Sequence, residues 1–214
     1  MFYIGIDLSG PSNSEETALV AFKASGQGSL SACHKLLGAD DYDILYSIRR
    51  FQIEGDIVVG LDAPLSYNVG GGDRAGDAEL RKKIISAGLK PGSVMPPTMT
   101  RMVYLTLRGV SIARMLLATS PQIKIVEVHP GAAMVLRGAP VSDVLDFKHR
   151  ERSRWNLLEW LFQQGLRDIS DISNPTDHYI AACACGLACW KWHQNKSVWI
   201  HHRDQPIHPF DYAC

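Results

Sequence analysis

The chain has 214 residues, of which 46% are hydrophobic and 21% are charged, a composition typical of a globular protein and not of a disordered one. Its 22 basic and 22 acidic residues cancel, so it lacks the strongly basic balance of many nucleic-acid-binding proteins. No apolar run approaches the roughly 20 residues of a membrane span, and the N-terminus enters a predicted strand without a basic leader. We therefore expect a cytoplasmic protein without a membrane partner, folded as a single domain over residues 1–214.

Short apolar runs near the N-terminus predict a β-meander. Residues 2–8 and 17–22 are rich in β-branched and aromatic side chains and are separated by the turn-forming SGPSNS, and a third run covers residues 30–36. The next segment, DDYDILYSIRRFQ, has apolar residues at helical spacing behind acidic residues, which predicts an amphipathic helix. An apolar run then leads into Asp62 in GDIVVGLDAPLS, as is typical of a parallel strand covered on both faces.

The rest of the chain predicts helices around one further strand. Residues 66–119 form an insertion rich in Gly and Pro at its start, with a helix in AGDAELRKKIISAG and a longer one over 98–119. The run IKIVEVHP predicts a fifth strand, residues 148–166 predict another helix, and DHYIAACACGLACWKWH predicts a last helix of small residues. A meander followed by helical crossovers predicts an α/β fold with a mixed sheet.

Four acidic residues fall where the predicted strands and helices are expected to bring them together. Asp7, Asp62 and Glu127 lie near the ends of predicted strands, and Asp177 begins the last helix. In open α/β sheets, functional sites form beyond the carboxyl ends of the strands. Divalent cations prefer oxygen ligands and can promote phosphodiester cleavage, so we predict that these four carboxylates bind Mg²⁺ or Mn²⁺ and are catalytic.

Each of these acids also has a structural alternative. Asp7 and Asp62 precede turn-forming residues and are compatible with a role as hydrogen-bond acceptors in turns. Glu127 is compatible with an ion pair to a basic neighbour. Asp177 is compatible with the acid of a capping box that begins at Asn174.

The segments GIDLSG, VVGLDAPLS, VEVHP and DHYIAACACGLA together resemble the domain of unknown function 429, a family described as predicted nucleases with a ribonuclease-H-like fold. The resemblance runs from Met1 to about Trp190. It implies a mixed five-stranded sheet flanked by helices, with the metal site at the four acids. One departure stands at the start of the last helix, where Asp177 is followed by His178 in place of the expected alanine.

Candidate substrate-binding residues lie in or beside the insertion. The stretch DRAGDAELR resembles a family segment in which an Arg, an Asp and a second Arg recur, here Arg74, Asp77 and Arg81. Together with Arg101, these arginines are candidates to bind a phosphate, although surface arginines are ordinarily solvated. His129 is a candidate to move protons or to contact a phosphate, with a structural role as the alternative.

Two further features are ambiguous. Cys185, Cys189 and His193 share one face of the last helix, but a single helix rarely supplies a closed zinc site, so buried thiols are the favoured interpretation. The closing HHRDQPIH is expected to be an exposed tail.

Metal-dependent phosphodiester hydrolysis of nucleic acid or a nucleotide is the favoured function. A non-catalytic binding module with the same fold is the first alternative, since the net charge is zero. A phosphoryl transferase of the actin-like or sugar-kinase-like type is the second. That class needs a second half and Gly-rich phosphate loops, for which 214 residues leave little room.

Overall fold

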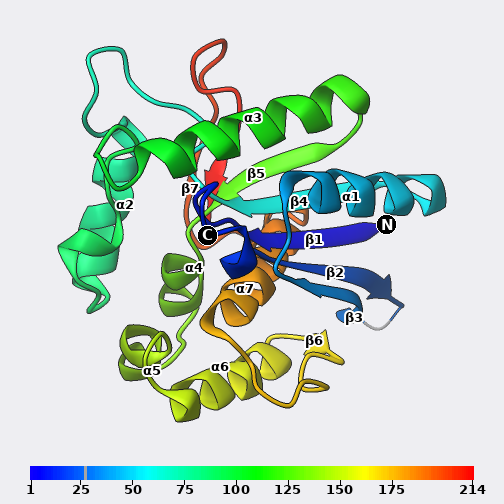
Figure 1. The fold of residues 1–214 in the computed structure, drawn as a ribbon. Helices are drawn as coiled ribbons and strands as arrows, with labels where there is room; N and C mark the ends of the chain where they lie inside the picture. Colours follow the sequence, from blue (N-terminus) through cyan, green and yellow to red (C-terminus); the bar gives the residue numbers. More distant parts are fainter. Residues whose placement is uncertain (27) are drawn as a thin grey trace.

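The computed structural model describes residues 1–26 and 28–214, which form one mixed sheet of eight strands flanked by seven α-helices (Figure 1). The five longer strands are β1 (Phe2–Asp7), β2 (Ala18–Ser25), β3 (Ser29–Leu37), β4 (Ile57–Asp62) and β5 (Lys124–Val128). They lie in the order β3-β2-β1-β4-β5, and among these five only β2 runs opposite to the others. The predicted α/β class, with a meander and parallel crossovers, is confirmed.

Three strands of two residues each extend the sheet at its edges. β6 (Leu166–Arg167) pairs with β3, β8 (Tyr212–Ala213) pairs with β5, and β7 (Ile200–His201) pairs with β8. The expected five-stranded sheet is therefore too small, because pairs of residues carry no periodic signal in the sequence. The predicted exposed tail is exposed over residues 202–207, but His201 belongs to β7 and His208 is half-buried.

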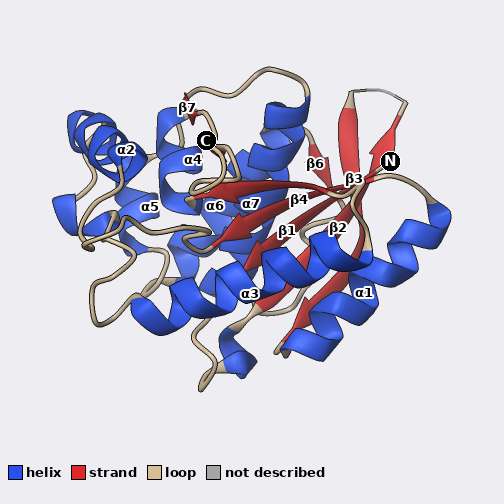
Figure 2. Ribbon diagram, turned by 90° about the horizontal axis from the view of Figure 1, so that it is seen from above, coloured by secondary structure: helices blue, strands red, loops and turns tan. Residues whose placement is uncertain are grey.

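Helices cover both faces of the sheet (Figure 2). α1 (Asp41–Glu54) and α3 (Val103–Thr119) pack on one face, and α7 (Asp177–His193) lies across the other. Gly5 of β1 and Gly60 of β4 are neighbours in the sheet, and a Cβ atom at either position would overlap the backbone of α7. The two glycines therefore let α7 lie directly on the centre of the sheet.

The remaining helices surround α7 or lie in the insertion. α4 (Pro130–Leu136) and α6 (Glu151–Gln163) pack against α7, α5 (Val141–Asp146) packs against α4 and α6, and α2 (Ala75–Ser86) belongs to the insertion. The short α4 and α5 were not predicted, and α3 begins at Val103 where the sequence suggests residue 98. None of the helices in the described part of the chain has the length and hydropathy of a membrane-spanning segment.

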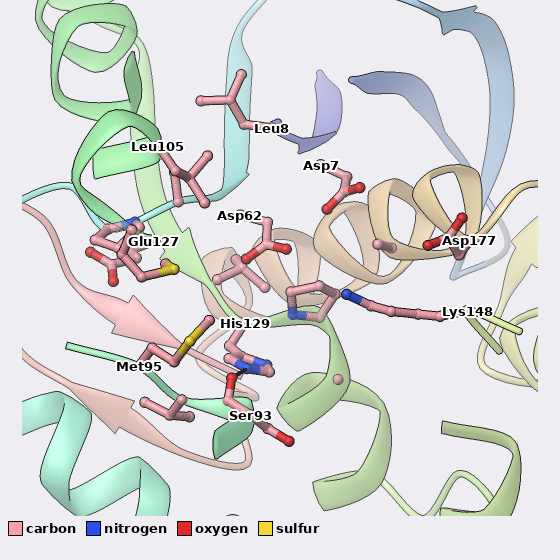
Figure 3. Close-up of a pocket in the computed structure, with 18 of the residues that line it drawn as sticks. Asp7, Leu8, Asp62, Ser93, Met95, Leu105, Glu127, His129, Lys148 and Asp177 are labelled. Atoms are coloured by element: carbon pink, nitrogen blue, oxygen red, sulfur yellow. Dashed lines mark hydrogen bonds between the residues drawn. The ribbon is translucent and has the colours of Figure 1, made fainter. Parts of the chain in front are cut away.

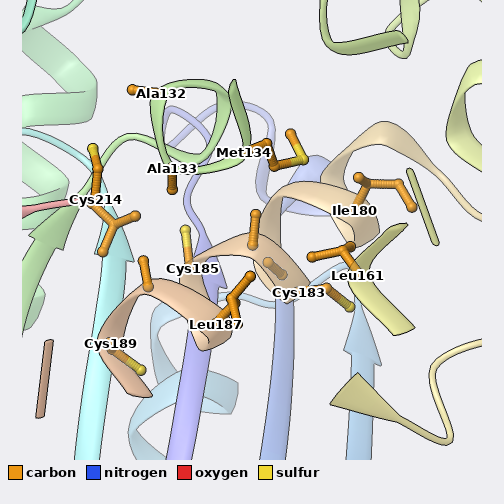
Figure 4. Close-up of a cluster of buried hydrophobic side chains, with 14 of the residues drawn as sticks. Ala132, Ala133, Met134, Leu161, Ile180, Cys183, Cys185, Leu187, Cys189 and Cys214 are labelled. Atoms are coloured by element: carbon orange, nitrogen blue, oxygen red, sulfur yellow. The ribbon is translucent and has the colours of Figure 1, made fainter. Parts of the chain in front are cut away.

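The cysteines of α7 are part of the apolar core (Figure 4). Cys183, Cys185 and Cys189 are buried, and burial raises the pKa of all three thiols. His193 at the end of the same helix binds the Tyr3 hydroxyl through Nδ1 at 3.0 Å. This packing agrees with the interpretation of these thiols as small core side chains.

Candidate functional site

Asp7 and Asp62 stand side by side at the carboxyl ends of β1 and β4, which are parallel neighbours in the sheet. Asp7 lies two residues after Gly5, and Asp62 lies two residues after Gly60; both glycines face α7. Because side chains alternate between the two faces of a strand, both carboxylates also point toward α7. Burial, and then the charge of Asp7, raise the pKa of Asp62 well above its ordinary value.

The first turn of α7 meets this pair through His178. The imidazole Nδ1 donates a hydrogen bond to Oδ2 of Asp7 at 2.6 Å, and Nε2 lies 3.9 Å from Oδ1 of Asp177. The hydrogen bond to Asp7 raises the pKa of His178. His178 therefore lies between two carboxylates and contributes positive charge beside Asp7 when it is protonated.

Asp177 is the first residue of α7 and does not act in a capping box. The helix is capped by Thr176, whose hydroxyl accepts a hydrogen bond from the amide of Tyr179. A helix that began at Asn174 would have made Asp177 the capping acid, so that alternative is wrong. Asp177 instead lines the same cavity as Asp7.

Glu127 lines the same cavity as Asp7 and Asp62, but its side chain leaves the sheet on the other face. Its neighbour in β4 is Leu61, one position before Asp62, so its side chain points to the opposite face of the sheet. There Glu127 accepts hydrogen bonds from Arg74 at 2.7 and 2.5 Å and from the amide of Leu65 at 2.9 Å. Within residues 1–26 and 28–214, no three His, Cys, Asp or Glu side chains stand ready to hold a metal ion together. Of the four predicted acids, Asp7 and Asp62 therefore form a close pair and Asp177 lies nearby. Glu127 instead forms a buried ion pair with Arg74.

Arg74 and Asp77, predicted to bind substrate, complete this buried ion pair. The five N–H groups of the Arg74 guanidinium are directed to Asp77, Glu127 and the hydroxyl of Ser66. Arg74 is 7% exposed and Asp77 only 2%. Since every donor of Arg74 already has a partner, this arginine holds the insertion on the sheet and has no group left to bind a phosphate.

The other predicted residues also have structural partners or lie away from the acids. Arg81 binds Asp73 through both terminal nitrogens, and Arg101 is exposed and does not line the cavity. His129 caps α4, since Nδ1 accepts from the amide of Ala132 while Nε2 donates to a backbone carbonyl at 2.6 Å. Burial lowers the pKa of His129, so its imidazole is neutral and both nitrogens are occupied.

A cavity of about 660 Å³ opens over the Asp7–Asp62 pair (Figure 3). Leu105 and Met95 form an apolar wall on one side of Asp62, with Glu127 beside them, and Lys148 extends from the other side. Lys148 is exposed, and in the described part of the chain no ion pair or hydrogen bond engages its ammonium group. The cavity therefore combines paired acids, an uncommitted cation and an apolar surface.

A model of a protein family, described as a protein of unknown function (DUF429), matches residues 5–205. The chain belongs to the DUF429 family. This confirms the resemblance, and the match extends beyond its expected end near Trp190. Comparison of this DUF429 chain with curated proteins and with solved structures gives no match.

Two residues of the DUF429 cavity were not predicted. His178 was noted only as a departure from the family pattern, and Lys148 only as the start of a helix. In the sequence, only the position of His178 directly after Asp177, in the first turn of the last helix, could have indicated that it lies near the acids. Lys148 follows the unpredicted α5, so no sequence pattern brought it near the acids.

The acids of the DUF429 chain are suited to hold one hard cation through two carboxylates, with the remaining ligands supplied from outside the protein. Mg²⁺ is usually held through one or two carboxylates, with water and substrate phosphates as its other ligands. Asp7 and Asp62 supply two carboxylates whose mutual repulsion a cation would relieve. The residues present therefore fit one Mg²⁺ or Mn²⁺, with Asp177 nearby.

Proposed function

We propose that this protein is a metal-dependent phosphodiester hydrolase of the nuclease type. The Asp7–Asp62 pair carries the proposal, because two adjoining carboxylates at the ends of parallel strands are costly without a cation. The order of the five longer strands, with one opposed member, is compatible with the ribonuclease-H-like fold that the family resemblance implies. Lys148 supports the proposal as a cation available to a phosphate at the same cavity.

The side chains have separate roles in this proposal. Asp7 and Asp62 would hold Mg²⁺ or Mn²⁺, which when bound polarises a phosphoryl oxygen and acidifies a bound water. His178 fixes the orientation of the Asp7 carboxylate, and Asp177 lies against the far side of the imidazole. Lys148 attracts and orients the phosphate from the side of the cavity opposite the apolar wall.

Hydrolysis of a panel of substrates tests the proposal. The panel contains single-stranded, duplex and branched DNA and RNA together with bis-p-nitrophenyl phosphate, each with Mn²⁺ or with EDTA. We expect Mn²⁺-dependent cleavage that Asp62→Asn lowers by about 100-fold or more. Asp56→Asn is the matched control, since Asp56 is exposed just before the other end of β4. No cleavage of any substrate with any divalent cation would overturn the proposal and favour a non-catalytic binding module.

A further inference from the structure

We infer that the cavity accepts a single nucleotide unit, either a free nucleotide ester or the terminal nucleotide of a single strand, and excludes a duplex. The inference deepens the proposed function and rests on it for the chemistry at the acids. Its own evidence is the size of the cavity, the separation of its apolar and charged sides, and the pairing of the nearby arginines.

The size and depth of the cavity fit one small ligand. Its volume of about 660 Å³ lies within the range of about 300–1,000 Å³ typical of small-molecule sites. Three segments contribute residues that surround the carboxyl ends of the strands: 89–95 in the insertion, 102–105 at the start of α3 and 144–148 at the end of α5. Asp7 is only 8% exposed at the bottom of this enclosure. A duplex, which presents its phosphates on a rigid and wide surface, is too large to bring one of them to this pair.

The two sides of the cavity match the two parts of a nucleotide. Leu105 and Met95, both half-buried, present aliphatic and thioether groups, against which the flat face of a base packs well. Lys148 lies across the acids from this wall and is placed to meet a phosphate. A ligand that contacts both sides at once therefore carries its phosphate over Asp62.

The distribution of charge disfavours a duplex as well. Binding to a duplex depends on several Lys and Arg side chains that neutralise successive phosphates. Arg74 and Arg81 are instead committed to carboxylates. Among the described residues that line the cavity, Lys90 and Lys148 are the cations left for a ligand, which suits one phosphate group and not a long row of them.

Calorimetric binding in Mn²⁺ tests this inference without relying on turnover. The probes are adenosine 5′-monophosphate, inorganic phosphate and a short blunt DNA duplex. We expect the nucleotide to bind about tenfold or more tightly than inorganic phosphate, because only the nucleotide contacts the apolar wall. We also expect that the duplex does not displace the nucleotide. A duplex that displaces it, or a nucleotide that binds no better than phosphate, would overturn the inference.

Variants of the two sides sharpen the test. Leu105→Asn is expected to weaken nucleotide binding about tenfold and to leave phosphate binding unchanged, because it removes apolar surface without adding charge. Its control is Leu107→Asn, on the same helix but 61% exposed and outside the cavity. Met95→Gln tests the same wall if Leu105→Asn does not fold. Equal nucleotide affinity in the parent and in a folded wall variant would contradict the inference.

Failure of this inference can be distinguished from failure of the proposed function. Selective nucleotide binding without hydrolysis of any substrate would contradict the hydrolase proposal and support the single-nucleotide cavity. Mn²⁺-dependent cleavage within a duplex, with no binding of the nucleotide, would support the hydrolase and overturn the cavity inference.

Discussion

Nδ1 of His178 donates a hydrogen bond of 2.6 Å to Oδ2 of Asp7, although the two residues are 171 positions apart in the chain. The bond joins the first turn of α7 to the end of β1 at the bottom of the cavity. It is possible because Gly5 and Gly60 let α7 lie close to the sheet. The position of a candidate ligand therefore depends on how the last helix packs.

His178→Ala should impair the site while the protein stays folded. We expect Mn²⁺ affinity and hydrolysis to fall by about 10- to 100-fold, because the Asp7 carboxylate loses the donor that orients it. His178→Asn keeps an N–H donor and should restore part of the Mn²⁺ affinity. His149→Ala, at an exposed histidine, is the control. Mn²⁺ affinity equal to that of the parent in His178→Ala would exclude the positioning role.

The raised pKa of Asp62 predicts a pH dependence of stability in the absence of metal. Folded Asp62 binds its proton more tightly than unfolded Asp62, so the free energy of unfolding falls as the pH rises from about 4 toward the raised pKa. The side chain of Asp62→Asn does not titrate, so the free energy of unfolding of this variant should fall less over the same pH range. Thermal melts of both proteins in EDTA from about pH 4 to about pH 8 measure the difference. Parallel curves would contradict the prediction, since the contribution of His178 is present in both proteins.

Arg74→Met should destabilise the fold strongly. The change leaves the buried carboxylates of Asp77 and Glu127 without their cation, which costs about 3 kcal/mol or more in the free energy of unfolding. Arg152→Met, at an exposed arginine, should change stability by less than about 0.5 kcal/mol. Urea denaturation measures both. An Arg74→Met protein as stable as the parent, but weaker in phosphate binding, would restore Arg74 as a phosphate-binding residue.

Gly60→Ala should separate α7 from the sheet. The added Cβ would lie 2.5 Å from the carbonyl oxygen of Cys185, a clash with backbone that no side-chain movement relieves. We expect a loss of about 3 kcal/mol in stability together with weaker Mn²⁺ binding, since α7 carries His178. Gly92→Ala is the control, because its Cβ would meet nothing within 4 Å. A Gly60→Ala protein with unchanged stability would contradict the close packing of α7.

The elements that sequence predicts well are those whose pattern is local. The strand before Asp62 and the helix over Asp177–His193 follow from an uninterrupted apolar run and from small residues behind a polar start. The two-residue strands at the sheet edge carry no such pattern, because they form only when distant segments supply their partners.

The candidate site shows the same division. That Asp7 and Asp62 meet followed from their positions at the ends of predicted parallel strands. The direction of the Glu127 side chain depends on the register between β4 and β5. Glu127 pairs with Leu61 and not with Asp62, and a shift of one residue places a side chain on the opposite face of the sheet. The partner of Glu127, Arg74, lies 53 residues away, and no spacing in the sequence indicates that contact.

Direct titration with Mn²⁺ is the measurement that tests the central claim most closely. The signal of free Mn²⁺ in electron paramagnetic resonance gives the bound amount for the parent and for Asp7→Asn, Asp62→Asn and Asp56→Asn. The account predicts a site in the parent and in Asp56→Asn that both Asp7→Asn and Asp62→Asn lose, because each removes one of the two carboxylates. Thermal melts should agree, with Mn²⁺ raising the melting temperature of the parent and of Asp56→Asn alone. A parent that binds no Mn²⁺, or an Asp62→Asn protein that binds it as the parent does, would contradict the account.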